Sequence, residues 1–154
     1  MCSRLSILAV VVVSALAVGG CASGKVREAN RYVKAVNQAQ LSFAASSDRL
    51  VTQISPDSRP AQDRVLVGRF STAVDTFVAR LRAITPPPRV TELHQRLIVA
   101  IVAFGHSLRV AGDNLTSKDA GRILDGQEQL GAATARVGRA INDTVAAINR
   151  ALKS

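Results

Sequence analysis

The chain has 154 residues, of which 20 are Lys or Arg and 11 are Asp or Glu, so its formal net charge is +9. Four Phe, one Tyr and no Trp provide few side chains on which bases could stack, which argues against nucleic acid as the partner. A chain of this length is expected to fold as one domain whose core needs no disulfide or metal.

The first 24 residues have the pattern of an export signal. One positive residue, Arg4, precedes an uncharged apolar run over residues 5–18, and small residues follow it. A membrane-spanning helix needs about 20 apolar residues, and this run is shorter. A cleaved leader is therefore favoured over a permanent membrane span.

The leader ends in the stretch Val18, Gly19, Gly20, Cys21. This stretch resembles the lipobox of bacterial lipoprotein precursors, in which an aliphatic residue and two small residues precede an obligatory cysteine. The resemblance implies that a diacylglyceryl lipid is attached to Cys21 and that residues 1–20 are removed, which leaves residues 21–24 as a lipidated tether. The residue types suit both steps, because small residues before the cleavage site fit a narrow peptidase groove and the thiolate of Cys21 is a strong nucleophile for lipid attachment. The alternative is an ordinary secretory cleavage or an uncleaved anchor, with Cys21 there by coincidence.

This resemblance also predicts where the protein resides. It implies a protein on the outward face of the cell membrane, and Ala22 after the cysteine resembles lipoproteins sent to the outer membrane in hosts with two membranes. Cys2 would leave with the leader and Cys21 would carry the lipid, so no thiol would remain for a disulfide or a metal site.

Residues 25–154 are expected to form an all-α domain, an antiparallel up-down-up-down four-helix bundle. The first helix is predicted from about residue 25 to 54, where core positions recur at steps of three and four until Pro56 and Pro60 interrupt the pattern. Its core-facing seam is Val26, Ala29, Val33, Val36, Gln40, Phe43, Ser47, Leu50 and Ile54.

Three further helices are predicted by the same spacing. The second stops before the prolines of residues 85–88, the third covers about residues 90–115, and a capping box of Thr116 and Asp119 begins the fourth. Glycines 121, 126, 131 and 138 are interpreted as sites of close helix contact rather than hinges. The three seams are Val67, Phe70, Val74, Phe77, Leu81 and Ile84; Val90, Leu93, Leu97, Ile101, Phe104, Leu108, Ala111 and Leu115; and Ile123, Leu130, Val137, Ile141, Val145, Ile148 and Leu152.

The bundle is not the only arrangement compatible with this pattern, since two helical hairpins could instead pack loosely or only on a partner. In its general form the predicted domain resembles the small helical lipoproteins of bacteria, and this resemblance implies no activity.

The short tether would hold one end of the bundle against the bilayer. The start of the first helix, the proline-rich turn and the end of the fourth helix would share that end, and basic residues concentrate in these segments. Anionic headgroups attract each nearby Lys or Arg by about 1 kcal/mol, so these residues are predicted to face the membrane. The alternative is a compositional bias that spreads arginine over solvated faces. The predicted membrane-facing residues are Lys25, Arg27, Arg31, Lys34, Arg80, Arg82, Arg89, Arg150 and Lys153.

No catalytic or metal-binding arrangement is recognisable, so a protein that is not an enzyme is predicted. His94 and His106 are twelve residues apart on one predicted helix, which turns them away from each other, and both are expected at the surface. No glutamate stands three residues before a histidine, as a di-iron bundle requires. The lipid on Cys21 is the only bound group expected.

Two features remain as candidates for function. Residues 97–104 are apolar on every face, and Ile98, Val99 and Val102 lie off the seam, so they either widen the core or form an exposed patch. Four asparagines at heptad spacing are either ordinary surface residues or pair across the first and fourth helices and set their register, and we hypothesise the pairs Asn30 with Asn149 and Asn37 with Asn142.

The leading functional hypothesis is a lipid-anchored, non-enzymatic bundle that interacts with the cell envelope, with an envelope protein or with a second copy of itself. The alternative is a carrier of a small apolar ligand, such as a lipid, in the bundle interior. A cavity lined by Phe70, Phe77, Leu97 and Phe104 would favour the carrier, whereas a filled core with Ile98 and Val102 exposed would favour the interaction module. A spacer without a specific ligand is the third possibility.

Overall fold

The computed structural model describes residues 24–53, 60–115 and 117–153. Its elements are α1 (Gly24–Val51), α2 (Pro60–Arg82), the short 3-10 helix η1 (Pro88–Val90), α3 (Thr91–Leu115) and α4 (Ala120–Lys153). No strand occurs in these ranges, and the prediction of an all-α chain with four long helices is confirmed. The leader and lipobox residues Val18, Gly19, Gly20 and Cys21 lie outside the described residues. Gly24, predicted to end the tether, is already the first residue of α1.

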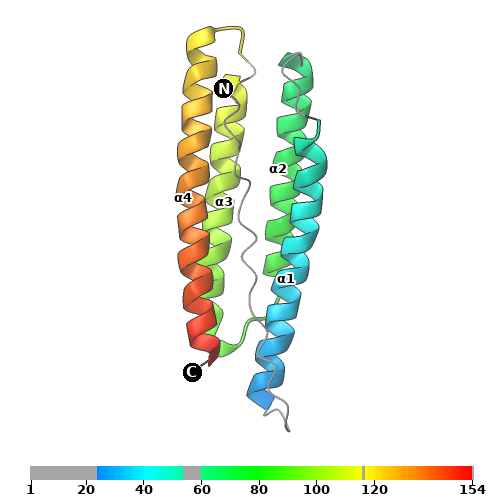
Figure 1. The fold of residues 1–154 in the computed structure, drawn as a ribbon, viewed down its shortest axis with the longest axis vertical. Coiled ribbons are helices and arrows are strands. Elements are labelled where there is room, and N and C mark those ends of the chain that lie inside the picture. Colours follow the sequence, from blue (N-terminus) through cyan, green and yellow to red (C-terminus); the bar gives the residue numbers. More distant parts are fainter. Residues whose placement is uncertain (1–23, 54–59, 116, 154) are drawn as a thin grey trace.

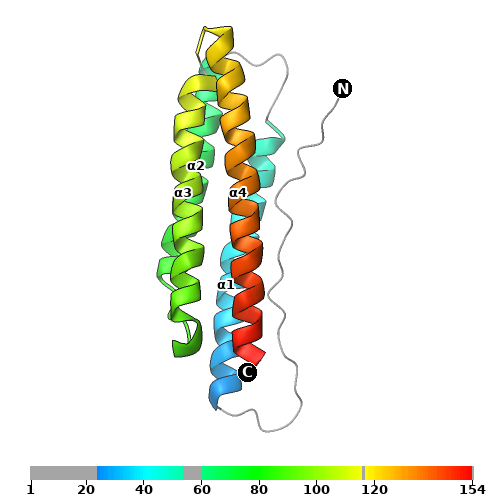
Figure 2. The ribbon, with the colours of Figure 1, turned by 90° about the vertical axis from the view of Figure 1, so that its left-hand side faces the viewer.

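The four helices lie side by side along one long axis (Figure 1). Consecutive helices are the closest neighbours, since α1 packs on α2, α2 on α3 and α3 on α4. The ribbon reverses direction from each helix to the next, and the view turned by 90° agrees (Figure 2). As a result, the start of α1, the connection from α2 to α3 and the end of α4 share one end of the molecule.

Local chemistry explains where the helices begin and end. After Arg82 only two more amides continue the last turn of α2, because Ala83 and Ile84 donate to the carbonyls of Ala79 and Leu81. Prolines 86–88 then provide no amide donors.

At the start of α4 the Asp119 carboxylate accepts a hydrogen bond of 3.1 Å from the backbone N–H of Arg122, so Asp119 is the N-cap itself.

The predicted capping box therefore had the cap three residues too early, and Thr116 lies outside the described residues. A carboxylate placed directly before the first helical turn also interacts favourably with the positive end of the helix dipole. This explains why Asp119 occupies the capping position.

The predicted seams face the core. Every seam residue with a described side chain is buried or half-buried, including Ser47, the polar residue at an apolar position of the first helix. Buried side chains of all four helices form one core. The spacing of apolar residues was therefore sufficient to orient each helix.

The bundle divides into two halves of different composition. We define the basic half as residues 24–42, 76–103 and 138–153, and the neutral half as residues 43–53, 60–75, 104–115 and 117–137. The basic half contains eleven Lys or Arg against three Asp or Glu, whereas the neutral half contains seven of each. The excess charge of the described chain therefore belongs to the half in which α1 begins.

Candidate functional site

The nine basic residues predicted to face a membrane all lie in the basic half, and all nine are exposed. They come from three segments that are far apart in the sequence, namely the first turns of α1, the end of α2 with η1, and the last turn of α4. These segments meet at one end of the bundle in Figure 1. The fold thus assembles one cationic surface from Lys25, Arg27, Arg31, Lys34, Arg80, Arg82, Arg89, Arg150 and Lys153.

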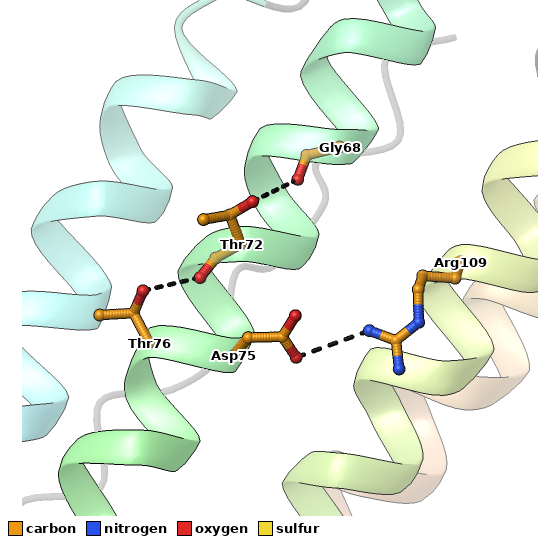
Figure 3. A network of polar contacts seen from close by, with 5 residues as sticks. All are labelled: Gly68, Thr72, Asp75, Thr76 and Arg109. Atoms are coloured by element: carbon orange, nitrogen blue, oxygen red, sulfur yellow. Dashed lines mark hydrogen bonds and ion pairs between the residues drawn. The ribbon is translucent and has the colours of Figure 1, made fainter.

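The neutral half differs in how its charges are arranged. There, Arg109 of α3 approaches Asp75 of α2 with an N–O distance of 3.5 Å (Figure 3). Both side chains are largely exposed, so this ion pair contributes little to stability. The basic half has too few carboxylates to balance its cations in this way, and its surface keeps a positive potential.

His94 is not a surface residue, and the prediction that it is exposed was wrong. Its relative exposure is 1%, and it lies in the basic half between α1, α2 and α3. Its Nε2 lies 3.0 Å from the carbonyl oxygen of Leu81, and its Nδ1 lies 3.2 Å from the hydroxyl of Tyr32. A carbonyl can only accept, so Nε2 carries the proton and Nδ1 accepts the hydrogen bond from Tyr32. His106, in contrast, is exposed as predicted.

The proline-rich turn explains why a histidine is buried at this position. The Leu81 carbonyl lies in the last turn of α2, where carbonyl groups lack helical partners, and the prolines that follow cannot supply amides. Ile84 satisfies one lone pair of this oxygen and His94 satisfies the other. The Tyr32 ring meets the imidazole edge to face, with 5.6 Å between centroids, so three helices are joined here.

Burial determines the protonation of this pair. It lowers the pKa of His94, against the opposing effect of the hydrogen bond to Leu81, and it raises the pKa of Tyr32 to about 12. At neutral pH the imidazole is therefore uncharged and the phenol keeps its proton. Both polar ends of the imidazole are occupied by protein groups, which makes the pair a joint between helices rather than an acid and a base that could reach a substrate.

The predicted partner patch separates into two parts. Ile98 is 3% exposed, so of the two alternatives it widens the core and does not contribute to a partner patch. Val99 and Val102 are 65% and 39% exposed, and Val110, also exposed, follows at helical spacing on the same helix. The apolar run of α3 thus widens the core and also leaves a row of valines in solvent.

The described residues form an open groove on the surface, whereas the carrier hypothesis requires a cavity in the bundle interior. Leu97 and Phe104 are buried in the core. Between α1 and α2 lies an open groove of about 410 Å³, and of the four side chains expected around a cavity only Phe77 lines it. Nothing in the sequence pattern indicated this groove, because its walls are small residues such as Ala39, Ser42 and Ala73.

The asparagine pairing stays a prediction. Asn30, Asn37 and Asn149 are half-buried and Asn142 is exposed. α1 and α4 approach each other less closely than consecutive helices do, which leaves more space between them for polar side chains.

Within the described ranges, no group of three His, Cys, Asp or Glu side chains is arranged to hold a metal ion. None of the described helices combines the length and the apolar character needed to cross a bilayer. Comparisons of the chain with protein-family models, with curated proteins and with solved structures found no match.

Proposed function

We propose that this chain is a lipid-anchored, non-enzymatic helical bundle of the bacterial cell envelope that rests with its basic half on an anionic membrane surface. In this proposal a signal peptide is cleaved before Cys21, a diacylglyceryl lipid anchors that cysteine, and the domain is an antiparallel up-down-up-down bundle. The observation that carries the proposal is the convergence of nine exposed cations on the end where α1 begins.

The length of the tether supports this orientation. α1 begins at Gly24, and the three-residue step from Cys21 to Gly24 spans about 10 Å even when fully extended. This reach is close to the Debye length of about 8 Å at physiological salt, within which each Lys or Arg gains about 1 kcal/mol near anionic lipids. A diacylglyceryl group carries two acyl chains and so supplies stable attachment by itself, and the basic surface would add the orientation.

The burial of Leu97 and Phe104 in the core, together with the exposure of Val102, supports an interaction function over carriage of a ligand in the bundle interior. The row formed by Val99, Val102 and Val110 lies on the outer face of α3 and is accessible to an envelope protein or to a second copy of the chain.

The lysines of the chain provide an internal test of orientation. Three of them, Lys25, Lys34 and Lys153, lie in the basic half, and Lys118 lies at the opposite end. The full chain isolated from its host would be reconstituted in vesicles with and without phosphatidylglycerol and treated with a water-soluble amine acylating reagent. We expect anionic vesicles to protect the three basic-half lysines and not Lys118, and salt to reverse the protection. Equal acylation of all four lysines on both vesicle types would overturn the orientation.

The anchor itself is tested by intact mass of the same preparation. A chain that starts at Cys21 and carries a diacylglyceryl increment, lost in a Cys21→Ala variant, is the expected result. An unmodified chain would overturn the lipid anchor.

A further inference from the structure

The groove between α1 and α2 is formed by one stripe of each helix. Lining residues recur at steps of three and four from Ala39 to Leu50 of α1, continue at Gln53 in the turn after it, and recur from Arg69 to Arg80 of α2. Six of the thirteen lining residues are Ala, Ser or Thr. The two helices therefore leave a groove along their shared outer face, because these side chains are too small to fill it.

The floor of the groove is apolar and preformed. Phe43 of α1 stacks on Phe77 of α2, with 4.9 Å between ring centroids and 13° between ring planes. Phe70 meets Phe43 edge to face at 6.3 Å, which fixes the Phe43 ring from the other side. An aromatic floor of this kind favours a hydrocarbon chain over a polar ligand.

The walls of the groove have no hydroxyl protons to offer. Ser42 and Ser46 donate to the carbonyls of Gln38 and Ser42, and the two α2 threonines donate to carbonyls four residues before them. Figure 3 shows Thr72 and Thr76 on the α1 side of α2, bonded to their own helix, while Asp75 points towards α3. The charged donors that the groove offers a ligand are therefore the guanidinium groups.

One end of the groove is cationic. No carboxylate lines the groove, and of its three arginines Arg49 and Arg69 lie at the end marked by Gln53, whereas Arg80, three residues after Phe77, lies towards the other end. Gln53 holds one of them, because its Oε1 accepts a hydrogen bond of 3.2 Å from the Arg69 guanidinium while its Nε2 donates one of 2.8 Å to the backbone carbonyl of Arg49. Arg49 follows Phe43 by six residues, so the cationic end lies about 9 Å from the aromatic floor along the helix axis.

We propose that this groove binds a single-chain anionic amphiphile, with the hydrocarbon chain on Phe43 and Phe77 and the carboxylate or phosphate group at Arg49 and Arg69. The volume of about 410 Å³ matches a small-molecule site. A partner helix, about 10 Å across with its side chains, is too large for it. The binding site is independent of the lipid on Cys21 and of the orientation on the membrane.

The test uses the full chain in neutral phosphatidylcholine nanodiscs and a long-chain fatty acid that carries a diazirine at the end of its hydrocarbon chain. After illumination, mass spectrometry locates the attached label. We expect labelling on α1 and α2 around Phe43 and Phe77, displaced by laurate or dodecyl phosphate but not by dodecanol. The more effective of the two anionic competitors identifies the headgroup. Label distributed evenly over all four helices, or displaced equally by dodecanol, would overturn the proposal.

Two sets of variants separate binding from folding. Arg49→Gln with Arg69→Gln is expected to weaken competition by laurate about tenfold, the scale of losing a charge-assisted hydrogen bond. The matched control, Arg64→Gln with Arg136→Gln, removes the same charge from exposed positions that do not line the groove. Ala73→Leu fills the groove and is expected to abolish labelling while the circular dichroism spectrum keeps its helical form. Equal effects of the two double variants, or undiminished labelling of a folded Ala73→Leu chain, would contradict the site.

Discussion

The two halves of the bundle are held together in different ways. Of the five largest side chains that are less than 2% exposed, four lie in the basic half, namely Leu81, Val90, His94 and Ile148. The neutral half instead buries small residues where its helices meet, among them Ser47, Ser71, Ala111, Gly112, Gly126 and Ala133. Most of the large, fully buried side chains thus lie in one half, whereas the other half buries several small residues beside larger ones such as Val74 and Leu108.

The two halves also differ in net charge. The basic half has an excess of eight positive charges, as eleven cations face three carboxylates, and repulsion among them opposes compact folding. The neutral half has no such excess. The larger fully buried side chains thus occur in the same half as the charge excess, where burial of apolar surface opposes the repulsion.

The largest effect is expected from a cavity in the basic half. Leu81 has a relative exposure of 0%, so Leu81→Ala should lower the free energy of unfolding by about 2–5 kcal/mol in urea titrations. Leu124→Ala, at a site that is 65% exposed, should change it by less than about 0.5 kcal/mol. Leu108→Ala probes the core of the neutral half, and a loss as large as that of Leu81→Ala would refute the difference between the halves.

The second prediction compares two glycines of α4 in the neutral half. A Cβ added at Gly126 would lie 3.0 Å from the backbone nitrogen of Leu115 and 3.1 Å from the carbonyl of Ala111. Backbone atoms cannot move aside easily, so Gly126→Ala should destabilise the bundle by about 1–3 kcal/mol. Gly131 has nothing within 4 Å, and Gly131→Ala should stabilise α4 by about 0.5–1 kcal/mol. Melting temperatures that move in the same direction for both variants would rule out close helix contact at Gly126.

The third prediction concerns the pH dependence of the basic half. Because burial lowers the pKa of His94 in the folded state, the unfolded chain binds a proton more readily than the folded chain. The full contribution of His94 to the free energy of unfolding should be present above the pKa of the unfolded state, about 6.5. As the pH falls from there to the pKa of the folded state, the free energy of unfolding should decrease by about 1.4 kcal/mol for each unit by which folding lowers the pKa. Urea midpoints across this interval measure the loss. His94→Gln should abolish this component and His106→Gln should leave it intact, and the reverse pattern would show that His94 is not responsible.

The last prediction concerns two buried serines. Here the removal of a native hydroxyl group is expected to stabilise the core. The Ser47 and Ser71 hydroxyls are buried without a hydrogen-bond partner. Ser47→Ala and Ser71→Ala should each raise the free energy of unfolding by about 1 kcal/mol, because an unsatisfied polar group returns to water when the chain unfolds. Ser46→Ala is the matched control, since that hydroxyl bonds to its own helix. A loss of stability in both buried variants would mean that the neutral half depends on those hydroxyls.

Much of the fold was predictable because helix formation and burial follow local spacing. Steps of three and four placed the seams, and the prolines at 56, 60 and 86–88 marked where helices stop. The error at His94 shows the limit of this approach. It lies four residues after Val90 and three before Leu97, which is a seam position, yet its polarity favoured the surface. The spacing predicted the burial of His94 better than its polarity did, because the Leu81 carbonyl and Tyr32 supply the hydrogen bonds that a buried imidazole requires.

The sequence by itself determined that the chain forms four long helices, which residues face the core and that basic residues concentrate in three segments. These properties depend on neighbours within one or two helical turns. Only the tertiary structure decided that Ile98 joins the core, that Tyr32 lies against His94 and that a groove remains between α1 and α2. Each of these depends on a helix elsewhere in the chain, as with the 62 residues that separate Tyr32 from His94. Contacts of this kind depend on how side-chain volumes fit together when the helices pack, which local periodicity does not encode.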